Sequence, residues 1–133
     1  MTASAPAALR PATELLAELT AGADERINPP TVCLCGSTRF WAQLAETNLR
    51  FTAAGCLVLA PGVDMKRPHP LWSDPADAAR LKHRLDRLHR HKIDRADHVV
   101  IVTDPTGYVG ASTLAEIVYA HDLGTPTWHW ALP

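Results

Sequence analysis

Glu116 is the side chain in this sequence with the clearest potential for covalent chemistry. It follows a loop at residues 104–112 that contains two glycines, and we expect it in the first turn of a helix opened by Ser112 and Thr113. A carboxylate at such a place serves as a nucleophile when a glycosidic carbon develops oxocarbenium character. The T-x-x-E spacing also fits a capping box, in which Glu116 accepts a hydrogen bond from the backbone N–H of Thr113. Spacing alone favours the cap.

A second candidate is the turn Gly36, Ser37, Thr38 and Arg39, between an apolar run and an expected helix. Glycine permits a tight turn, a helix start offers free N–H groups, and the hydroxyls and guanidinium suit a phosphate. The turn matches neither a Walker loop nor a G-x-G-x-x-G motif. An ordinary strand-to-helix turn with Ser37 or Thr38 as N-cap explains the same residues equally well.

The proline-rich loop at residues 64–74 offers further polar groups. Asp64 begins it, and Lys66, Arg67 and Trp72 follow. Long loops in compact domains often bind ligands or act as lids. We therefore count Asp64 among the candidate substrate-binding residues and expect its neighbours to contact a base or a phosphate.

The cysteines and histidines do not form a familiar metal motif. Cys33 and Cys35 would share one face of a strand, but no C-x-x-C or H-E-x-x-H accompanies them. His89 and His91 fall on an expected helix, where residues two apart do not share a face. His89 should also lie near the helix end that is far from the carboxyl ends of the strands. We expect buried apolar cysteines and no metal.

Apolar runs alternate with helical patterns along most of the chain. The apolar runs are residues 31–35, 56–60, 98–103 and 125–130, and the expected helices are residues 11–19, with Thr13 as N-cap, 39–54, 77–96 and 112–123. Continuous apolar strands suit a parallel sheet that is buried on both faces. The sequence predicts a single doubly wound α/β domain, Rossmann- or flavodoxin-like, with a mostly parallel sheet of four to five strands. Ligands of such sheets bind outside the carboxyl ends of the strands, where the candidate turn and both loops should meet.

Length and composition limit the class of protein. The chain has 133 residues, 47% hydrophobic and 20% charged, with a net charge of −1, which suits one globular domain and gives no global field toward nucleic acid or anionic lipid. Residues 80–95 hold seven Lys or Arg against two Asp. We interpret this run as a solvated helix face and expect no nucleic-acid partner.

From the N-terminal residues and the hydropathy we expect a cytoplasmic protein without a membrane partner. No apolar run approaches the roughly 20 residues of a membrane span, and residues 1–10 lack the features of a signal peptide. We expect residues 1–10 to be disordered and residues 11–133 to form the domain.

Three motifs together resemble the nucleoside 2-deoxyribosyltransferase-like superfamily, which includes nucleoside 5′-monophosphate N-glycosidases. They are CGSTRF at residues 35–40, HRHKIDRAD at residues 89–97 and YVGASTLAE at residues 108–116. The match is closest to a bacterial and phage branch with CGSTRF-type sequences, and it covers roughly residues 31–126.

The resemblance implies an enzyme, a hydrolase or transferase of nucleotide metabolism, that cleaves an N-glycosidic bond. It assigns the nucleophile to Glu116, places Asp97 near the sugar, and gives phosphate binding to Gly36, Ser37 and Arg39. We add Tyr108 as an orienting group, and Thr38, Gly110, Ser112 and Thr113 as substrate contacts. With this support catalysis by Glu116 is favoured over the cap. The family also implies no cofactor, a small-molecule nucleoside or nucleotide as partner, and a homodimer.

Two departures from the family motivate a second hypothesis. Gly110 stands where the transferases have an aspartate, and His89 stands where some hydrolases have an acidic residue. The alternative is a non-catalytic nucleotide-binding or sensing module of the same fold.

Overall fold

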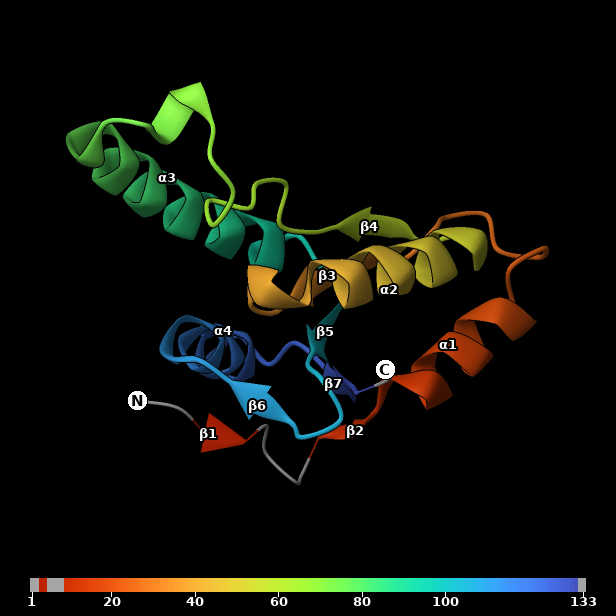
Figure 1. Ribbon diagram of the computed structural model, residues 1–133. Helices are drawn as coiled ribbons and strands as arrows, with labels where there is room; N and C mark the ends of the chain where they lie inside the picture. Colours follow the sequence, from red (N-terminus) through yellow and green to blue (C-terminus); the bar gives the residue numbers. More distant parts are fainter. Residues whose placement is uncertain (1–2, 5–8, 132–133) are drawn as a thin grey trace.

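Two apolar runs with almost no exposed surface form the centre of the sheet, as β3 (Thr31–Cys35) and β5 (His98–Val102). The computed structural model describes residues 3–4 and 9–131. The remaining strands of this sheet are β2 (Arg10–Pro11), β4 (Leu57–Leu59) and β7 (Thr127–Trp130). The five strands are all parallel, in the order β2-β7-β5-β3-β4 (Figure 1). This arrangement confirms the predicted doubly wound α/β fold.

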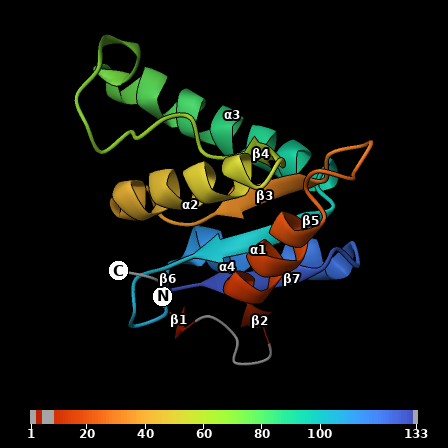
Figure 2. The ribbon, with the colours of Figure 1, turned by 90° about the vertical axis from the view of Figure 1, so that its right-hand side faces the viewer.

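Helices cover both faces of the sheet. They are α1 (Ala12–Ala21), α2 (Trp41–Ala53), α3 (Pro75–Asp94) and α4 (Ala111–Asp122), with short 3₁₀ turns η1 (Thr38–Phe40) and η2 (Pro70–Trp72). In Figure 2, α1 lies in front of the strands and α4 behind them. Across the described residues, no helix combines the length and the apolar character needed to cross a bilayer.

The predicted N-cap of α1 is wrong. Pro11, not Thr13, precedes the helix, with φ −62° and no capping side chain. Pro11 has extended backbone with ψ 129°, and the helical backbone begins at Ala12, two residues before the start that a Thr13 N-cap would give.

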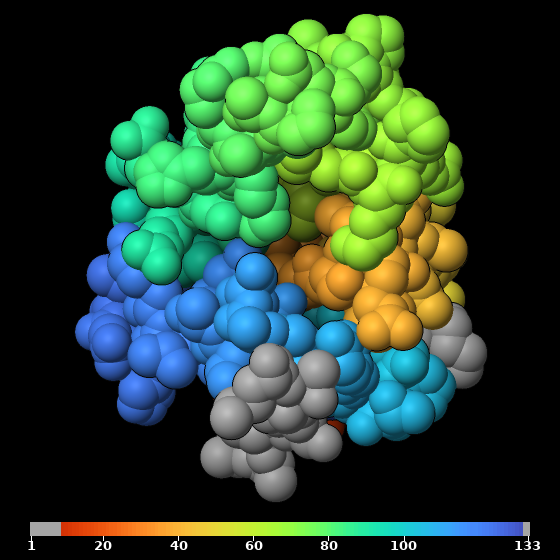
Figure 3. Space-filling model, turned by 60° about the vertical axis from the view of Figure 1, so that its left-hand side comes forward, coloured from red at the N-terminus to blue at the C-terminus, as the bar shows by residue number. Residues whose placement is uncertain are grey.

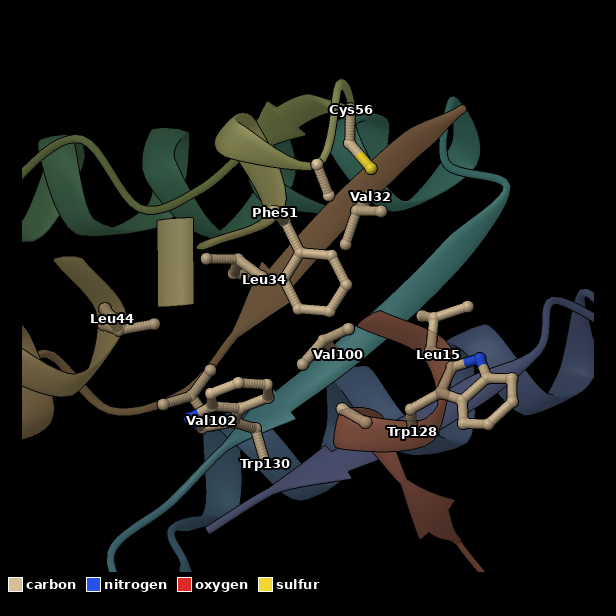
Figure 4. Packing of buried hydrophobic residues seen from close by; sticks show 12 residues of the cluster. Leu15, Val32, Leu34, Leu44, Phe51, Cys56, Val100, Val102, Trp128 and Trp130 are labelled. Atoms are coloured by element: carbon tan, nitrogen blue, oxygen red, sulfur yellow. The ribbon is translucent and has the colours of Figure 1, made fainter. Parts of the chain in front are cut away.

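Alternate residues of β3 enter two different cores. Val32 and Leu34 pack under α1 and α2 with Phe51 and Trp130 (Figure 4). The Phe51 and Trp130 rings meet edge to face, with centroids 5.9 Å apart. Cys33 and Cys35 point to the opposite face, confirming that they share one side of the strand.

The second core is smaller and contains more polar atoms at its edge. Cys33 and Cys35 pack there with Ile93 of α3 and Ile117 of α4. In α3, only His89 and Ile93 are buried. The rest of this 20-residue helix extends past the edge of the sheet, so α3 covers only part of this face (Figure 1).

Part of the expected disordered N-terminus is in strands. Ala3–Ser4 forms β1, which pairs antiparallel with β6 (Tyr108–Val109), and Arg10–Pro11 forms β2 on the edge of the main sheet. Backbone pairing with the sheet and with the loop after β5 orders segments whose own composition predicted disorder. Residues 1–2 and 5–8 of that prediction lie outside the described part of the chain.

Gly36 permits the chain to leave β3 beside the end of β5. A Cβ at this position would lie 2.6 Å from the carbonyl oxygen of Val102. We expect Gly36→Ala to lower the free energy of unfolding by about 1–3 kcal/mol, because backbone must shift to relieve this overlap. Urea denaturation measures the change.

Gly62→Ala is the matched control, because a Cβ at Gly62 meets no heavy atom within 4 Å. Its effect on stability should stay below about 1 kcal/mol. Equal effects of the two substitutions would contradict the close approach at Gly36.

Candidate functional site

A cavity of about 470 Å³ opens at the carboxyl ends of β3 and β4. Its walls come from the turn at residues 36–38, the loop at residues 61–66, the side of α3 that faces the sheet, and the first two turns of α4. Figure 3 shows the hollow between the green surface of α3, the orange start of α2 and the blue surface of α4. Its size falls in the usual range for small-molecule sites, and its place agrees with the general rule for parallel sheets.

The turn after β3 contains a helix cap and also borders the cavity. The Ser37 Oγ accepts a hydrogen bond from the backbone N–H of Arg39 at 3.2 Å, so Ser37 is the N-cap of η1. The same turn lines the cavity. Lys66 Nζ donates to Thr38 Oγ1 at 2.7 Å, which places an ammonium group beside the turn. Together these groups form a cationic, hydroxyl-bearing corner that suits an anion.

Glu116 does not cap its helix. α4 begins at Ala111, after Gly110 as N-cap, and no side chain caps it. Thr113 therefore lies within the first turn, and Glu116 lies in the second turn instead of the first. The capping box that spacing alone favoured is wrong, because the helix starts two residues before Thr113. The Glu116 side chain is 19% exposed and lines the cavity.

A buried cluster surrounds the Glu116 carboxyl group. His89 Nε2 lies 3.8 Å from Glu116 Oε1. The same nitrogen lies 3.3 Å from Cys35 Sγ and 3.9 Å from Cys33 Sγ. Both thiols are fully buried, whereas the imidazole and the carboxyl group reach the cavity. The cluster thus joins the second core to the cavity.

Burial and mutual charge shift the pKa values in this cluster. Burial raises the pKa of Glu116, although the nearby His89 acts against this. Burial alone would lower the pKa of His89, but contact with Cys33 and the charge of Glu116 outweigh it, and the pKa is raised. A hydrogen bond with Cys35 lowers the pKa of Cys33 to about 6, and the same bond raises that of Cys35. Cys33 is therefore the thiol that ionises first.

The structure brings together many of the predicted site residues. Those that line the cavity are Gly36, Ser37, Thr38, Gly110, Ser112, Thr113 and Glu116. They come from two segments that are about 70 residues apart in sequence, and they meet because β3 and β5 are neighbours with the same direction.

Asp97 is not at the cavity. It precedes β5, and its Oδ2 accepts a hydrogen bond from the backbone N–H of Thr31 at 2.8 Å. Thr31 begins β3, so Asp97 lies at the amino ends of the strands. The structure gives Asp97 a structural contact at the end of the sheet opposite the cavity, because the two ends of a parallel strand are separated by the length of the strand.

Three further predicted site residues do not line the cavity, namely Arg39, Tyr108 and Asp64. The Arg39 guanidinium stacks 4.7 Å from the centre of the Tyr108 ring, and that ring meets Phe40 edge to face. Asp64 accepts a hydrogen bond from the backbone N–H of Lys66 at 3.1 Å and so shapes the loop that presents the Lys66 ammonium group. The direct substrate contacts predicted for these three residues stay predictions, and the contacts seen here are with the protein itself.

His89 and Lys92 are cavity residues that the sequence analysis did not assign to the site. The helical spacing of the apolar residues could have indicated that His89 is buried. It lies four residues after Leu85 and four before Ile93, on the apolar side of α3. We expected His89 to lie far from the carboxyl ends of the strands, and this was wrong. Cys35, at the carboxyl end of β3, lies on the same face of the sheet and contacts the imidazole. Lys92 Nζ donates to the Ala60 carbonyl oxygen at 2.7 Å and ties α3 to the end of β4.

Comparisons with protein-family models, with curated proteins and with solved structures found no match to this chain. The family suggested by the three motifs stays a prediction, and the geometry described above carries the functional argument.

Substitutions of Asp97 test its position at the end of the sheet opposite the cavity. We expect Asp97→Ala to lower the free energy of unfolding by about 1 kcal/mol, because the Thr31 N–H loses its acceptor. Asp97→Asn retains an acceptor oxygen and should lose less. Neither variant should change ligand binding in the cavity by calorimetry, and a large loss of binding in both would return Asp97 to the site.

Proposed function

We propose that this protein hydrolyses the N-glycosidic bond of a nucleoside 5′-monophosphate, with Glu116 as the nucleophile. The observation that carries the proposal is the Glu116 carboxyl group, which makes no capping bond and faces the same cavity as the anion-suited corner at Ser37, Thr38 and Lys66. The resemblance of three motifs to the nucleoside 2-deoxyribosyltransferase-like superfamily supports the same chemistry.

The reaction divides into two displacement steps. A Glu116 carboxylate oxygen forms a bond to C1′ while the C1′–N bond breaks, and the electron pair leaves with the base, which takes a proton from solvent or a neighbouring acid. Water then attacks C1′ of the glycosyl ester, releases the sugar phosphate and regenerates the carboxylate. Glu116 meets the geometric requirement, because its carboxyl group borders empty space instead of bonding its own backbone.

His89 supports the nucleophile in this proposal as a positioning residue. Its Nε2 lies 3.8 Å from Glu116 Oε1, and its positive charge favours the ionised carboxylate against the effect of burial. The apolar part of the cavity wall, which includes Val63, Met65 and Leu85, provides the surface for a base. The corner at residues 36–38 then receives the phosphate.

Glu116→Gln tests the nucleophile. An amide is a poor nucleophile of similar shape, so we expect base release from a panel of nucleoside 5′-monophosphates to fall by about a thousandfold or more. Chromatography of the free base measures the rate, and thermal unfolding verifies the fold. Glu46→Gln, which changes an exposed carboxylate on α2, is the control and should keep full activity.

Lys66→Met tests phosphate recognition. Loss of the ammonium group beside Thr38 should raise KM for a nucleotide by about tenfold, the value of one charge-assisted hydrogen bond, while KM for the corresponding nucleoside stays unchanged. Arg67→Met is the control, since Arg67 is exposed and does not line the cavity. A parallel rise for nucleoside and nucleotide would argue against a phosphate at this corner.

A non-catalytic nucleotide-binding module is the second candidate, and one observation favours it. Asp97, Tyr108 and Arg39, which the catalytic hypothesis placed around the sugar and phosphate, are engaged elsewhere. Calorimetric binding of a nucleotide without any release of base would select this alternative over hydrolysis.

A further inference from the structure

Four potential metal ligands from three separate elements converge at the inner end of the cavity. Cys33 and Cys35 come from β3, His89 from α3 and Glu116 from α4. The two thiols and the imidazole nitrogen all lie within 4.8 Å of one another. The Glu116 carboxyl group closes the open side, 3.8 Å from His89 Nε2. We propose that these four side chains form a binding site for a zinc ion.

The distances suit a tetrahedral ion. Zn–S bonds of about 2.3 Å and Zn–N bonds of about 2.0–2.1 Å place the ligands of a tetrahedron about 3.3–3.8 Å apart. The separations from His89 Nε2 are 3.3 Å to Cys35 Sγ, 3.9 Å to Cys33 Sγ and 3.8 Å to Glu116 Oε1. The atoms of Cys33, Cys35 and His89 are mutually within 4.8 Å, and the Glu116 carboxyl group, which is near His89, must rotate toward the thiols to complete the tetrahedron.

The ligand types select zinc among common ions. Mg²⁺ and Ca²⁺ prefer oxygen ligands, whereas thiolate and imidazole suit Zn²⁺. Cys₂His with a fourth position filled by oxygen is an established zinc environment. β3 is central and buried, so the spacing of the two thiols is determined by the strand before any ion arrives.

The residues around the four ligands give an ion access from the cavity and provide a positive charge that compensates the negative ligands. His89 and Glu116 line the cavity, so an ion reaches the buried thiols from that side. Two thiolates and one carboxylate bind a doubly charged ion with one negative charge left over, and the ammonium group of Lys92 lies close enough to influence both Cys33 and His89. Binding requires the thiolates, the neutral imidazole and the carboxylate, so the protons that these four side chains hold are released to solvent, with no change of oxidation state.

A zinc ion at this site would occupy the carboxyl group that the proposed function uses as its nucleophile. The two uses of Glu116 exclude each other, so the metal-loaded protein would be inactive in base release. The metal proposal does not rest on the glycosidase proposal, and its test needs no nucleotide.

Cobalt titration tests the site directly. Reduced, chelator-treated protein is titrated with Co²⁺, which reports tetrahedral thiolate coordination by visible ligand-field bands and a near-ultraviolet sulfur-to-cobalt charge-transfer band. We expect both to saturate at one equivalent and to disappear when Zn²⁺ is added. Absence of both bands in the folded wild-type protein would overturn the proposal.

Cysteine variants assign the ligands. Cys33→Ser and Cys35→Ser should each lose most of the charge-transfer intensity, and Cys56→Ser should keep it, because Cys56 is also buried but belongs to the opposite core. Unchanged bands in Cys35→Ser would contradict the assignment. Should a variant fail to fold, X-ray absorption of the zinc-loaded wild type decides: two sulfur ligands at about 2.3 Å support the site, and a shell of oxygen and nitrogen alone excludes it.

Discussion

The contact between the His89 imidazole and the thiols of β3 determines the shape of the cavity at the carboxyl ends of the strands. α3 has only two buried residues, His89 and Ile93, and both lie in its C-terminal half. They hold that half against the sheet, on the face where Cys33 and Cys35 emerge. The N-terminal half then continues past the edge of the sheet, and the space beneath it is the cavity.

The loop after β4 and helix α4 depend on this anchoring. The loop after β4 returns under α3 and places Lys66 beside the turn after β3. α4 packs on the other side of the same core through Ile117 and Ala120, which brings Glu116 to the imidazole. The polar groups of the site are thus positioned by buried apolar neighbours one turn away on each helix, as is general for sites on rigid elements.

The polar cluster has a cost in stability that apolar residues at these positions would not have. Burying an imidazole and a carboxyl group requires that each finds a partner, because an unpaired buried charge is strongly unfavourable. Here the partners are one another and the two thiols. Aliphatic side chains at positions 89 and 116 would avoid this cost, because they need no polar partner.

The amino-acid sequence by itself determined β3, β4, β5, β7, the four helices, the parallel sheet and the end of the sheet where the cavity lies, because these follow from local apolar patterns and from the direction that strand–helix repeats impose. It also identified Glu116 and the turn at residues 36–38. Only the tertiary structure decided that Glu116 is free of a capping bond, that Asp97 belongs to the far end of the sheet, and that His89 meets Cys33 and Cys35. The contacts of His89 with the two cysteines join residues that are 54 and 56 positions apart in the sequence. Local sequence patterns do not predict such contacts, because only the packing of a helix on a sheet brings these side chains together.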